Sequence, residues 1–188
     1  VCAGSPHHLP RTQSSIAISA NSTDWLLVNA SPDVLQQIKA FPGLQPARAL
    51  RDTGIAAVML MDAQIDHTTG LLMLREHRQR LPLYCHPLVR EDLTSGNPLF
   101  KVLEHYCGID WQALSLEDSF AINGLDGLAF AVLPLLSNAP PYSPHRDKPQ
   151  PGETWVCLRR TMPRAKNCFM RPAWVRWSPM CGPRCKPV

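Results

Sequence analysis

The sequence predicts an α/β fold in which short strands alternate with short helices. Residues 55–61 form a continuous apolar run with the length of a strand that is buried on both faces. Helix-start signals and apolar stripes fall between this run and the other predicted strands. The 188 residues, 45% of them hydrophobic, suffice for one domain with a substantial core, and 19 prolines are too many for a helical bundle.

The elements before the buried strand are a strand pair and a helix. Residues 14–19 and 25–30 predict two strands that pair through a turn. Residues 31–33 (SPD) are typical of a helix start, with the serine as the N-cap and the proline at the first helical position. The helix is expected to end at about residue 40, because Pro-Gly follows shortly after it.

The later elements are shorter. We predict a strand over 83–85, helices over 87–93 and 98–106, strands over 114–122 and 128–133, and a loop over 138–152. The loop contains five prolines and no aliphatic run, which excludes a helix or a central strand. No apolar run approaches the roughly 18–20 residues of a membrane span, so we expect no membrane span and a cytoplasmic location.

The composition changes abruptly after residue 152. Residues 1–152 hold 11 Lys+Arg against 14 Asp+Glu, whereas residues 153–188 hold 8 Lys+Arg against a single acidic residue. The tail also holds four of the seven cysteines and three of the five tryptophans. We therefore expect a partial domain over 1–152 and a tail over 153–188 that is a separate module or not native coding sequence. A basic tail with tryptophans would ordinarily indicate nucleic-acid binding, which stays open as the alternative.

The polar residues directly after the buried strand form the first candidate site. They follow the pattern Asp62-x-Gln64-x-Asp66-His67. In open α/β sheets, residues just past the carboxyl end of a strand line the ligand crevice, and Asp66 and His67 are competent ligands for a divalent ion. The alternative is that Asp66 caps the helix that follows and His67 is a solvated residue of its first turn.

The proline-rich loop is the second candidate site. It carries Tyr142, His145 and Arg146, and a stiff loop of this kind could close over an anionic ligand. Arg146 would form bidentate hydrogen bonds, and His145 would donate a proton. An ordinary surface loop is the alternative.

Four segments together resemble the PqqB family, which acts in the biosynthesis of pyrroloquinoline quinone (PQQ). They are residues 11–15 (RTQSS), 29–33 (NASPD), 64–71 (QIDHTTGL) and 137–146 (SNAPPYSPHR). The resemblance covers roughly residues 2–152 and keeps the segments in the family's order.

The resemblance implies the first half of a metallo-β-lactamase αββα sandwich with a metal site at one end of its two sheets. The superfamily's His-x-His-x-Asp-His motif falls on residues 62–67, so Asp62 and Gln64 replace the leading histidines, whereas Asp66 and His67 remain as catalytic, metal-binding residues. This departure argues against a two-zinc hydrolase and favours a single iron ion with open coordination positions. Cys2 resembles the last cysteine of the family's structural zinc cluster.

The implied function is iron-dependent hydroxylation of the Tyr-derived part of a Glu-Tyr precursor. The partners would be the PQQ precursor peptide or a small-molecule intermediate, bound by Tyr142, His145 and Arg146, and other PQQ-biosynthesis proteins. The alternative is a carrier that moves PQQ or a precursor towards the periplasm.

The resemblance also offers an explanation of the basic tail. Reading residues from about Glu153 onward two nucleotides on produces strings like the family's next segment, so we expect an out-of-frame tail and no nucleic-acid partner. A chain that lacks half of the sandwich, with no strand pattern in its tail, should expose a sheet face, aggregate and be a defective fragment.

Overall fold

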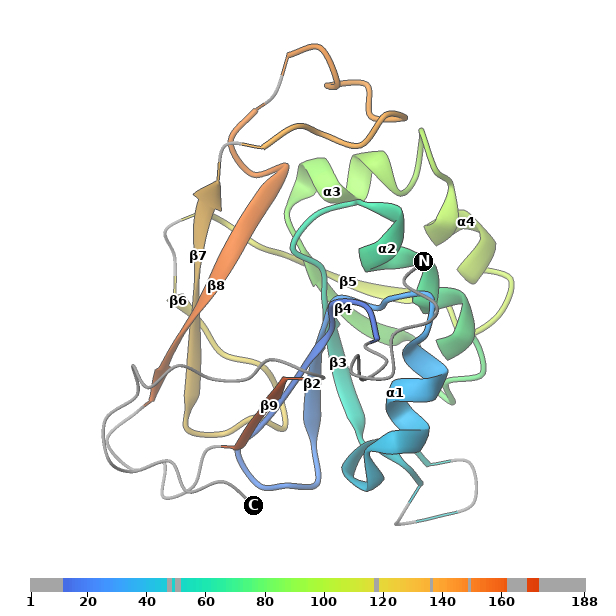
Figure 1. Ribbon diagram of the computed structural model, residues 1–188, viewed down its shortest axis with the longest axis vertical. Coiled ribbons are helices and arrows are strands. Elements are labelled where there is room, and N and C mark those ends of the chain that lie inside the picture. Colours follow the sequence, from blue (N-terminus) through green and yellow to red (C-terminus); the bar gives the residue numbers. More distant parts are fainter. Residues whose placement is uncertain are drawn as a thin grey trace, which may run out of the picture.

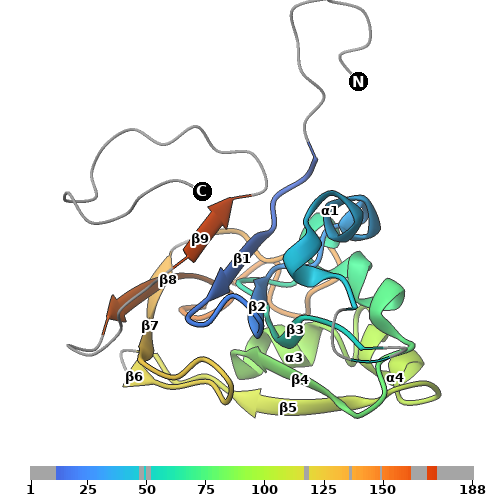
Figure 2. The ribbon, with the colours of Figure 1, turned by 90° about the horizontal axis from the view of Figure 1, so that it is seen from below.

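The computed structural model describes residues 12–46, 49, 52–116, 119–135, 137–148, 150–161 and 169–172, with the backbone alone for 156–161 and 169–172. The described residues form a six-stranded sheet and a three-stranded sheet. Figures 1 and 2 show the helices on one face of the larger sheet and the smaller sheet on the opposite face. This mixed α/β arrangement confirms the predicted fold class.

The larger sheet has the strand order β5-β4-β3-β2-β1-β9 and the smaller sheet the order β6-β7-β8. The four strands from β2 to β5 run parallel, β1 pairs with β2 and β9 in antiparallel register, and the smaller sheet is antiparallel throughout. The strands are β1 (Ile16–Ser19), β2 (Trp25–Val28), β3 (Ile55–Met59), β4 (Leu81–Cys85), β5 (Ile109–Ala113), β6 (Ser119–Phe120), β7 (Leu128–Leu135), β8 (Thr154–Thr161) and β9 (Phe169–Pro172).

The helices are short and lie in the connections between the parallel strands. They are α1 (Val34–Ala40), α2 (Ile65–Thr68), α3 (Pro87–Asp92) and α4 (Leu99–Leu103), with 3-10 turns η1 (Pro42–Leu44) and η2 (Thr69–Leu74). None of the helices in the described part of the chain has the length and apolar content that crossing a lipid bilayer requires.

The two faces of the larger sheet enclose two separate cores. Successive residues of a strand point to opposite faces, so Val58 of β3 packs against the helices, whereas Ala57 and Met59 pack towards the smaller sheet. On β2, Leu26 and Leu27 alternate in the same way. Both faces of these central strands are therefore buried, as the apolar run predicted.

Two predicted elements differ from the structure. The helix predicted from residue 31 begins at Val34, and its cap position, Asp33, forms no capping hydrogen bond. The Ser31 hydroxyl donates instead to Asp33 Oδ1 over 2.6 Å, and Asp33 Oδ2 accepts the Gln13 N–H, so these side chains tie the chain before β1 to α1. The strand predicted over 114–122 is wrong, because β5 ends at residue 113 and β6 comprises 119–120, where the chain passes from one sheet to the other.

The residues of the expected tail that the structure describes contain two strands. Residues of β8 pair with the whole of β7, from Leu135↔Thr154 to Leu128↔Thr161. Trp155 is fully buried in the core between the sheets, and its backbone N–H donates to the Met61 carbonyl. The expectation that the tail offers no strand to the sheet is therefore wrong for these residues. A boundary at residue 152 stays a prediction.

Candidate functional site

The candidate site lies where the parallel strands end. The segment from residue 60 leaves β3, passes Asp62 and enters α2. Asn29, just after β2, has a positive φ of 59° and accepts the Met61 N–H through Oδ1. The chain past β2 also holds α2 directly, because the Ala30 N–H donates to the His67 carbonyl over 2.7 Å.

A glycine permits this close approach of α2. The Gly70 N–H donates to the Ala30 carbonyl over 2.9 Å, and a Cβ at residue 70 would fall 2.1 Å from the Ser31 carbonyl oxygen. A side chain cannot occupy that space, so glycine is required where η2, which follows α2 directly, packs against the chain after β2. The backbone that carries His67 is thus fixed by contacts on both sides.

The imidazole of His67 lies between two carboxylates. Its Nδ1 is 2.7 Å from Asp62 Oδ1, and its Nε2 is 3.9 Å from Asp66 Oδ2. The Asp62 side chain is 8% exposed, the His67 side chain 22% and the Asp66 side chain 61%. One nitrogen of the ring therefore faces a buried carboxylate and the other faces an open, acidic position.

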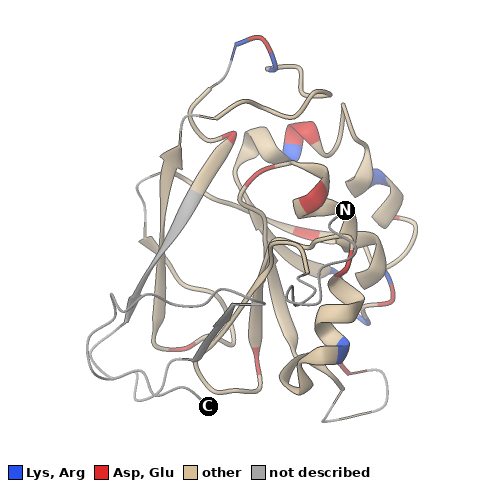
Figure 3. Cartoon of the chain, in the orientation of Figure 1, with Lys and Arg blue, Asp and Glu red and all other residues tan. Residues whose placement is uncertain are grey.

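The electrostatics of this position favour positive charge. The hydrogen bond to Asp62 raises the pKa of His67, burial opposes it, and the charges of Asp62 and Asp66 raise it further. Figure 3 shows more acidic residues on α3 and directly before β8, near the same end of the sheets. A negatively charged edge of this kind attracts cations.

The capping alternative for Asp66 and His67 is wrong. The N-cap position of α2 is Gln64, which forms no side-chain capping bond, and Asp66 lies within the first turn. His67 is half-buried and hydrogen-bonded to Asp62, so it is not a solvated residue.

The loop over 137–153 packs against the segment that leads into α2. The Tyr142 hydroxyl donates to the Ala63 carbonyl, and Gln64 Nε2 donates to the Asn138 carbonyl over 3.4 Å. The described residues of 138–152 form turns and bends and no helix or strand, as predicted. The structure thus brings the two candidate sites side by side.

The three candidate binding residues of this loop contact the protein itself. Burial raises the pKa of Tyr142, whose hydroxyl holds Ala63. His145 Nε2 lies 3.1 Å from Glu91 Oε2, and Arg146 Nη1 donates to the Ala139 carbonyl. These contacts fasten the loop, and the binding of substrate by Tyr142, His145 and Arg146 stays a prediction.

The sequence profile of the Beta-lactamase superfamily domain matches residues 24–188. The chain belongs to the beta-lactamase superfamily. The described part of this superfamily domain contains no group of three or more His, Cys, Asp or Glu residues arranged to hold a metal ion, and Cys2 lies outside the described residues. The metal-binding role of Asp66 and His67 stays a prediction.

Curated relatives confirm the resemblance to the PqqB family. The chain is 65% identical over 143 residues to coenzyme PQQ synthesis protein B of Azoarcus sp. (strain BH72), a match covering 76% of this chain and 47% of the relative. It is 58% identical over 168 residues to the protein of that name from Nitrosococcus oceani, covering 86% of this chain and 54% of the relative. The chain thus spans about half the length of these relatives.

Solved structures with a similar fold include a protein of the PqqB family. The Zn²⁺-bound PqqB from Methylobacterium extorquens matches with a TM-score of 0.71 and 34% identity, over 85% of this chain and 52% of that one. A diphosphatase from the PhnP family matches with a TM-score of 0.57 and 19% identity, over 87% of this chain and 58% of that one, which shows the fold alone.

Sequence reasoning missed two buried carboxylates near the site. Asp92 and Glu153 are each 1% exposed, and their carboxylate oxygens have no hydrogen-bond partner of standard geometry among the described residues. Burial raises the pKa of Asp92, while the neighbouring Ser143 hydroxyl opposes that shift. Asp92 follows Arg90 and Glu91 in a polar run that resembles a solvated helix face, so no local signal marks its burial.

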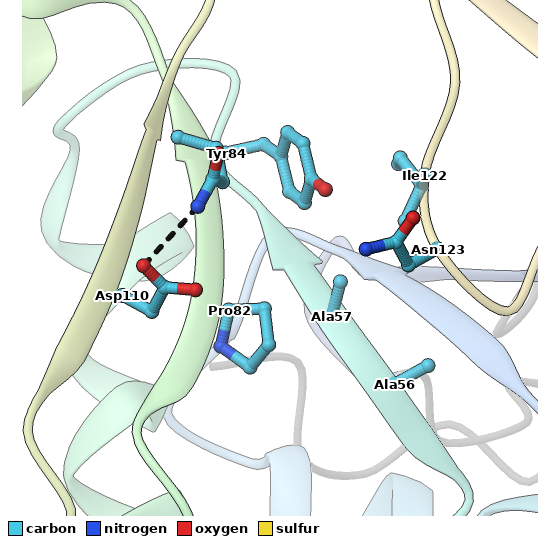
Figure 4. Close-up of a pocket in the computed structure, with 8 residues that line it drawn as sticks. Ala56, Ala57, Pro82, Tyr84, Asp110, Ile122 and Asn123 are labelled. Atoms are coloured by element: carbon cyan, nitrogen blue, oxygen red, sulfur yellow. Dashed lines mark hydrogen bonds between the residues drawn. The ribbon is translucent and has the colours of Figure 1, made fainter.

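A small hollow lies on the face of the larger sheet that carries Ala57 and Tyr84. It has a volume of about 130 Å³ and is lined by residues of β3, β4 and β5 together with Ile122 and Asn123. Figure 4 shows Asp110, Pro82 and Tyr84 on this wall, with Asn123 on the opposite side. Substrate pockets usually measure roughly 300–1,000 Å³, so this hollow is too small for a PQQ-sized ligand.

Proposed function

We propose that the PqqB family acts in PQQ biosynthesis by an iron-dependent hydroxylation of the Tyr-derived part of a Glu-Tyr precursor, and that this chain carries part of the site for that reaction. Asp66 and His67 would hold the metal and act as the catalytic residues. The observation that carries the proposal is the pairing of His67 Nε2 with Asp66 Oδ2, 3.9 Å apart at the carboxyl end of the parallel strands. The family relationship supplies the pathway.

The two donors fit a transition-metal ion. An imidazole nitrogen and a carboxylate oxygen suit iron or zinc, and His67 Nε2 and Asp66 Oδ2 lie 3.9 Å apart. The Asp66 side chain is 61% exposed, so it has room to turn towards an ion. Iron bound with open coordination positions would supply activation of dioxygen. A further donor is expected from a histidine in the part of the relatives that this chain does not match.

The chain's own residues would position the substrate. Asp66 and His67 would hold the metal, and the loop with Tyr142, His145 and Arg146 would cover the precursor peptide or intermediate. A structural zinc site at Cys2, contacts with other PQQ-biosynthesis proteins and a cytoplasmic location stay predictions. No observation favours the carrier function, because Arg146 already donates to Ala139.

The metal assignment is tested by titrating the purified chain with Co²⁺ and Fe²⁺. Wild-type protein should bind one ion weakly, because the chain provides a pair of ligands, and His67→Ala and Asp66→Ala should abolish binding. The same substitutions in the full-length Azoarcus relative should remove metal and Glu-Tyr hydroxylation together. Tight PQQ binding with no dependence on metal would support the carrier function instead.

We also propose that the chain is a defective fragment whose sequence from about Glu153 is out of frame. The proposal is supported by the composition break, since residues 153–188 hold 8 basic residues against 1 acidic residue. The nucleotide sequence around codon 153 should show the shift. An intact frame that encodes this tail, with matching peptide masses, would contradict it, and a salt-dependent gel shift would favour a nucleic-acid-binding tail.

A further inference from the structure

We propose that Asp62 is a positioning residue that fixes the ring orientation and the tautomer of His67, so that the lone pair of Nε2 faces the metal position. This inference rests on the proposed role of His67 as a ligand. Asp62 occupies the place of the superfamily motif's first histidine, and here it would support a ligand rather than serve as one.

The hydrogen bond between the two side chains determines the tautomer. Asp62 Oδ1 lies 2.7 Å from His67 Nδ1, and an ionised carboxylate can only accept. The proton of the neutral ring must therefore be on Nδ1, which leaves the lone pair on Nε2. That nitrogen is 3.9 Å from Asp66 Oδ2, too far for a hydrogen bond that would favour the other tautomer.

Asp62 is itself held in place. Its Oδ1 also accepts the Gln64 N–H over 2.9 Å, and its side chain is 8% exposed. The neighbouring Met61 N–H donates to the Asn29 side chain, while the His67 carbonyl accepts from Ala30. The segment that carries the Asp62 carboxylate and the segment that carries the His67 ring are thus each bonded to the chain after β2. The ring therefore cannot turn without breaking its hydrogen bond to Asp62.

The arrangement has a known energetic consequence. A carboxylate that accepts from the second nitrogen of a ligating histidine orients the ring and raises its basicity. Loss of such a partner typically weakens metal binding by about 10–100-fold. Asp66 flanks the same ring from the Nε2 side, so it is a matched comparison: one carboxylate supports the ring and the other faces the ion.

The tautomer can be measured on the metal-free chain. With ¹⁵N-labelled histidine, ring-nitrogen NMR spectra above the titration of His67 should show the proton on Nδ1, with His67→Gln supplying the assignment. Asp62→Ala should lose this preference, Asp66→Asn should keep it, and Asp62→Asn should retain it because the amide oxygen still accepts. A wild-type ring protonated on Nε2, or an unchanged tautomer in Asp62→Ala, would overturn the proposal.

Metal binding gives the second readout. Co²⁺ affinity measured by absorption should fall by about 10–100-fold in Asp62→Ala and less in Asp62→Asn. If Asp62→Ala fails to fold, the proposal is tested by the tautomer of the wild-type ring and by the tautomer and Co²⁺ affinity of Asp62→Asn. A wild-type chain with the expected tautomer that binds no Co²⁺ would refute the proposed metal function and leave the positioning role intact.

Discussion

The imidazole of His86 lies directly against the α-carbon of Gly152. A Cβ at residue 152 would fall 2.4 Å from His86 Cε1, and the φ of Gly152 is +102°. His86 also accepts the Leu88 N–H through Nδ1, which places the ring at the start of α3. The contact therefore joins the end of the 137–153 loop to the helix beside the candidate site.

Gly152→Ala should destabilise the fold by at least about 2 kcal/mol. A positive φ costs an L-residue roughly 1–2 kcal/mol, and the overlap with the His86 ring adds a packing penalty. Gly124→Ala is the control, because its φ is +84° but a Cβ there meets nothing closer than 3.6 Å. Urea unfolding of both variants measures the difference. Equal losses of stability in the two variants would show that the His86 ring moves aside and that the overlap adds no penalty.

His86 and His145 should affect stability with opposite pH dependence. Burial lowers the pKa of His86, so protonation favours the unfolded chain, and stability is lost as the pH falls below about 6.5. Glu91 raises the pKa of His145, so its contribution is full below about 6.5 and is lost as the pH rises through the folded value. The His145 effect should stay below about 1 kcal/mol, because Glu91 is half exposed.

Unfolding measured from pH 5 to 8 tests these signs. The free energy of unfolding of wild type, relative to that of His86→Gln, should increase as the pH rises. The free energy of unfolding of wild type, relative to that of His145→Gln, should decrease as the pH rises. In a Glu91→Gln background, substituting His145 should no longer change the pH dependence. Curves of the same sign for both histidines would contradict the assigned environments.

Tyr142→Phe should loosen the loop from the segment that leads into α2. The substitution removes the hydroxyl that donates to the Ala63 carbonyl and keeps the ring, so about 0.5–1.5 kcal/mol of stability should be lost. Tyr106, which is 58% exposed, supplies the control Tyr106→Phe. If Tyr142→Phe is as stable as that control, the hydroxyl does not hold the loop.

Local patterns predicted the parts of the fold that short sequence windows determine. An apolar run predicts the strand at 55–59, and the structure confirms it. The boundary of that run points to Asp66 and His67, whose role as metal ligands stays a prediction. The bond from Asp62 to His67 was not foreseen, because it depends on how the segment turns after the strand. The pairing of β7 with 154–161 was missed because it joins segments separated by a proline-rich loop, and no periodicity records such a contact.

Asp92→Asn should stabilise the protein near neutral pH by about 1 kcal/mol or more. Burial raises the pKa of Asp92, so the native state favours the protonated form, and stability is lost as the pH rises from about 3.9 through the folded value. The neutral amide avoids burying a charge that lacks a partner. Asp126→Asn, at an exposed position, is the control, and urea midpoints at pH 4 and pH 7 measure both. A variant that is less stable than wild type at pH 7 would show that the carboxylate is paired.

Trp155 decides whether β8 is part of the folded core. It is fully buried between the two sheets, so Trp155→Ala should cost about 3–5 kcal/mol and weaken the cooperative transition. Its indole N–H has no partner among the described residues, so Trp155→Phe removes an unsatisfied donor and should cost much less. Leu133→Ala, at a position 39% exposed on the neighbouring strand β7, should change the stability little. A urea titration followed by circular dichroism ranks the three variants. If Trp155→Ala unfolds like wild type, or the wild-type chain shows no cooperative transition, β8 does not complete the core and the expected aggregation-prone chain is the better description.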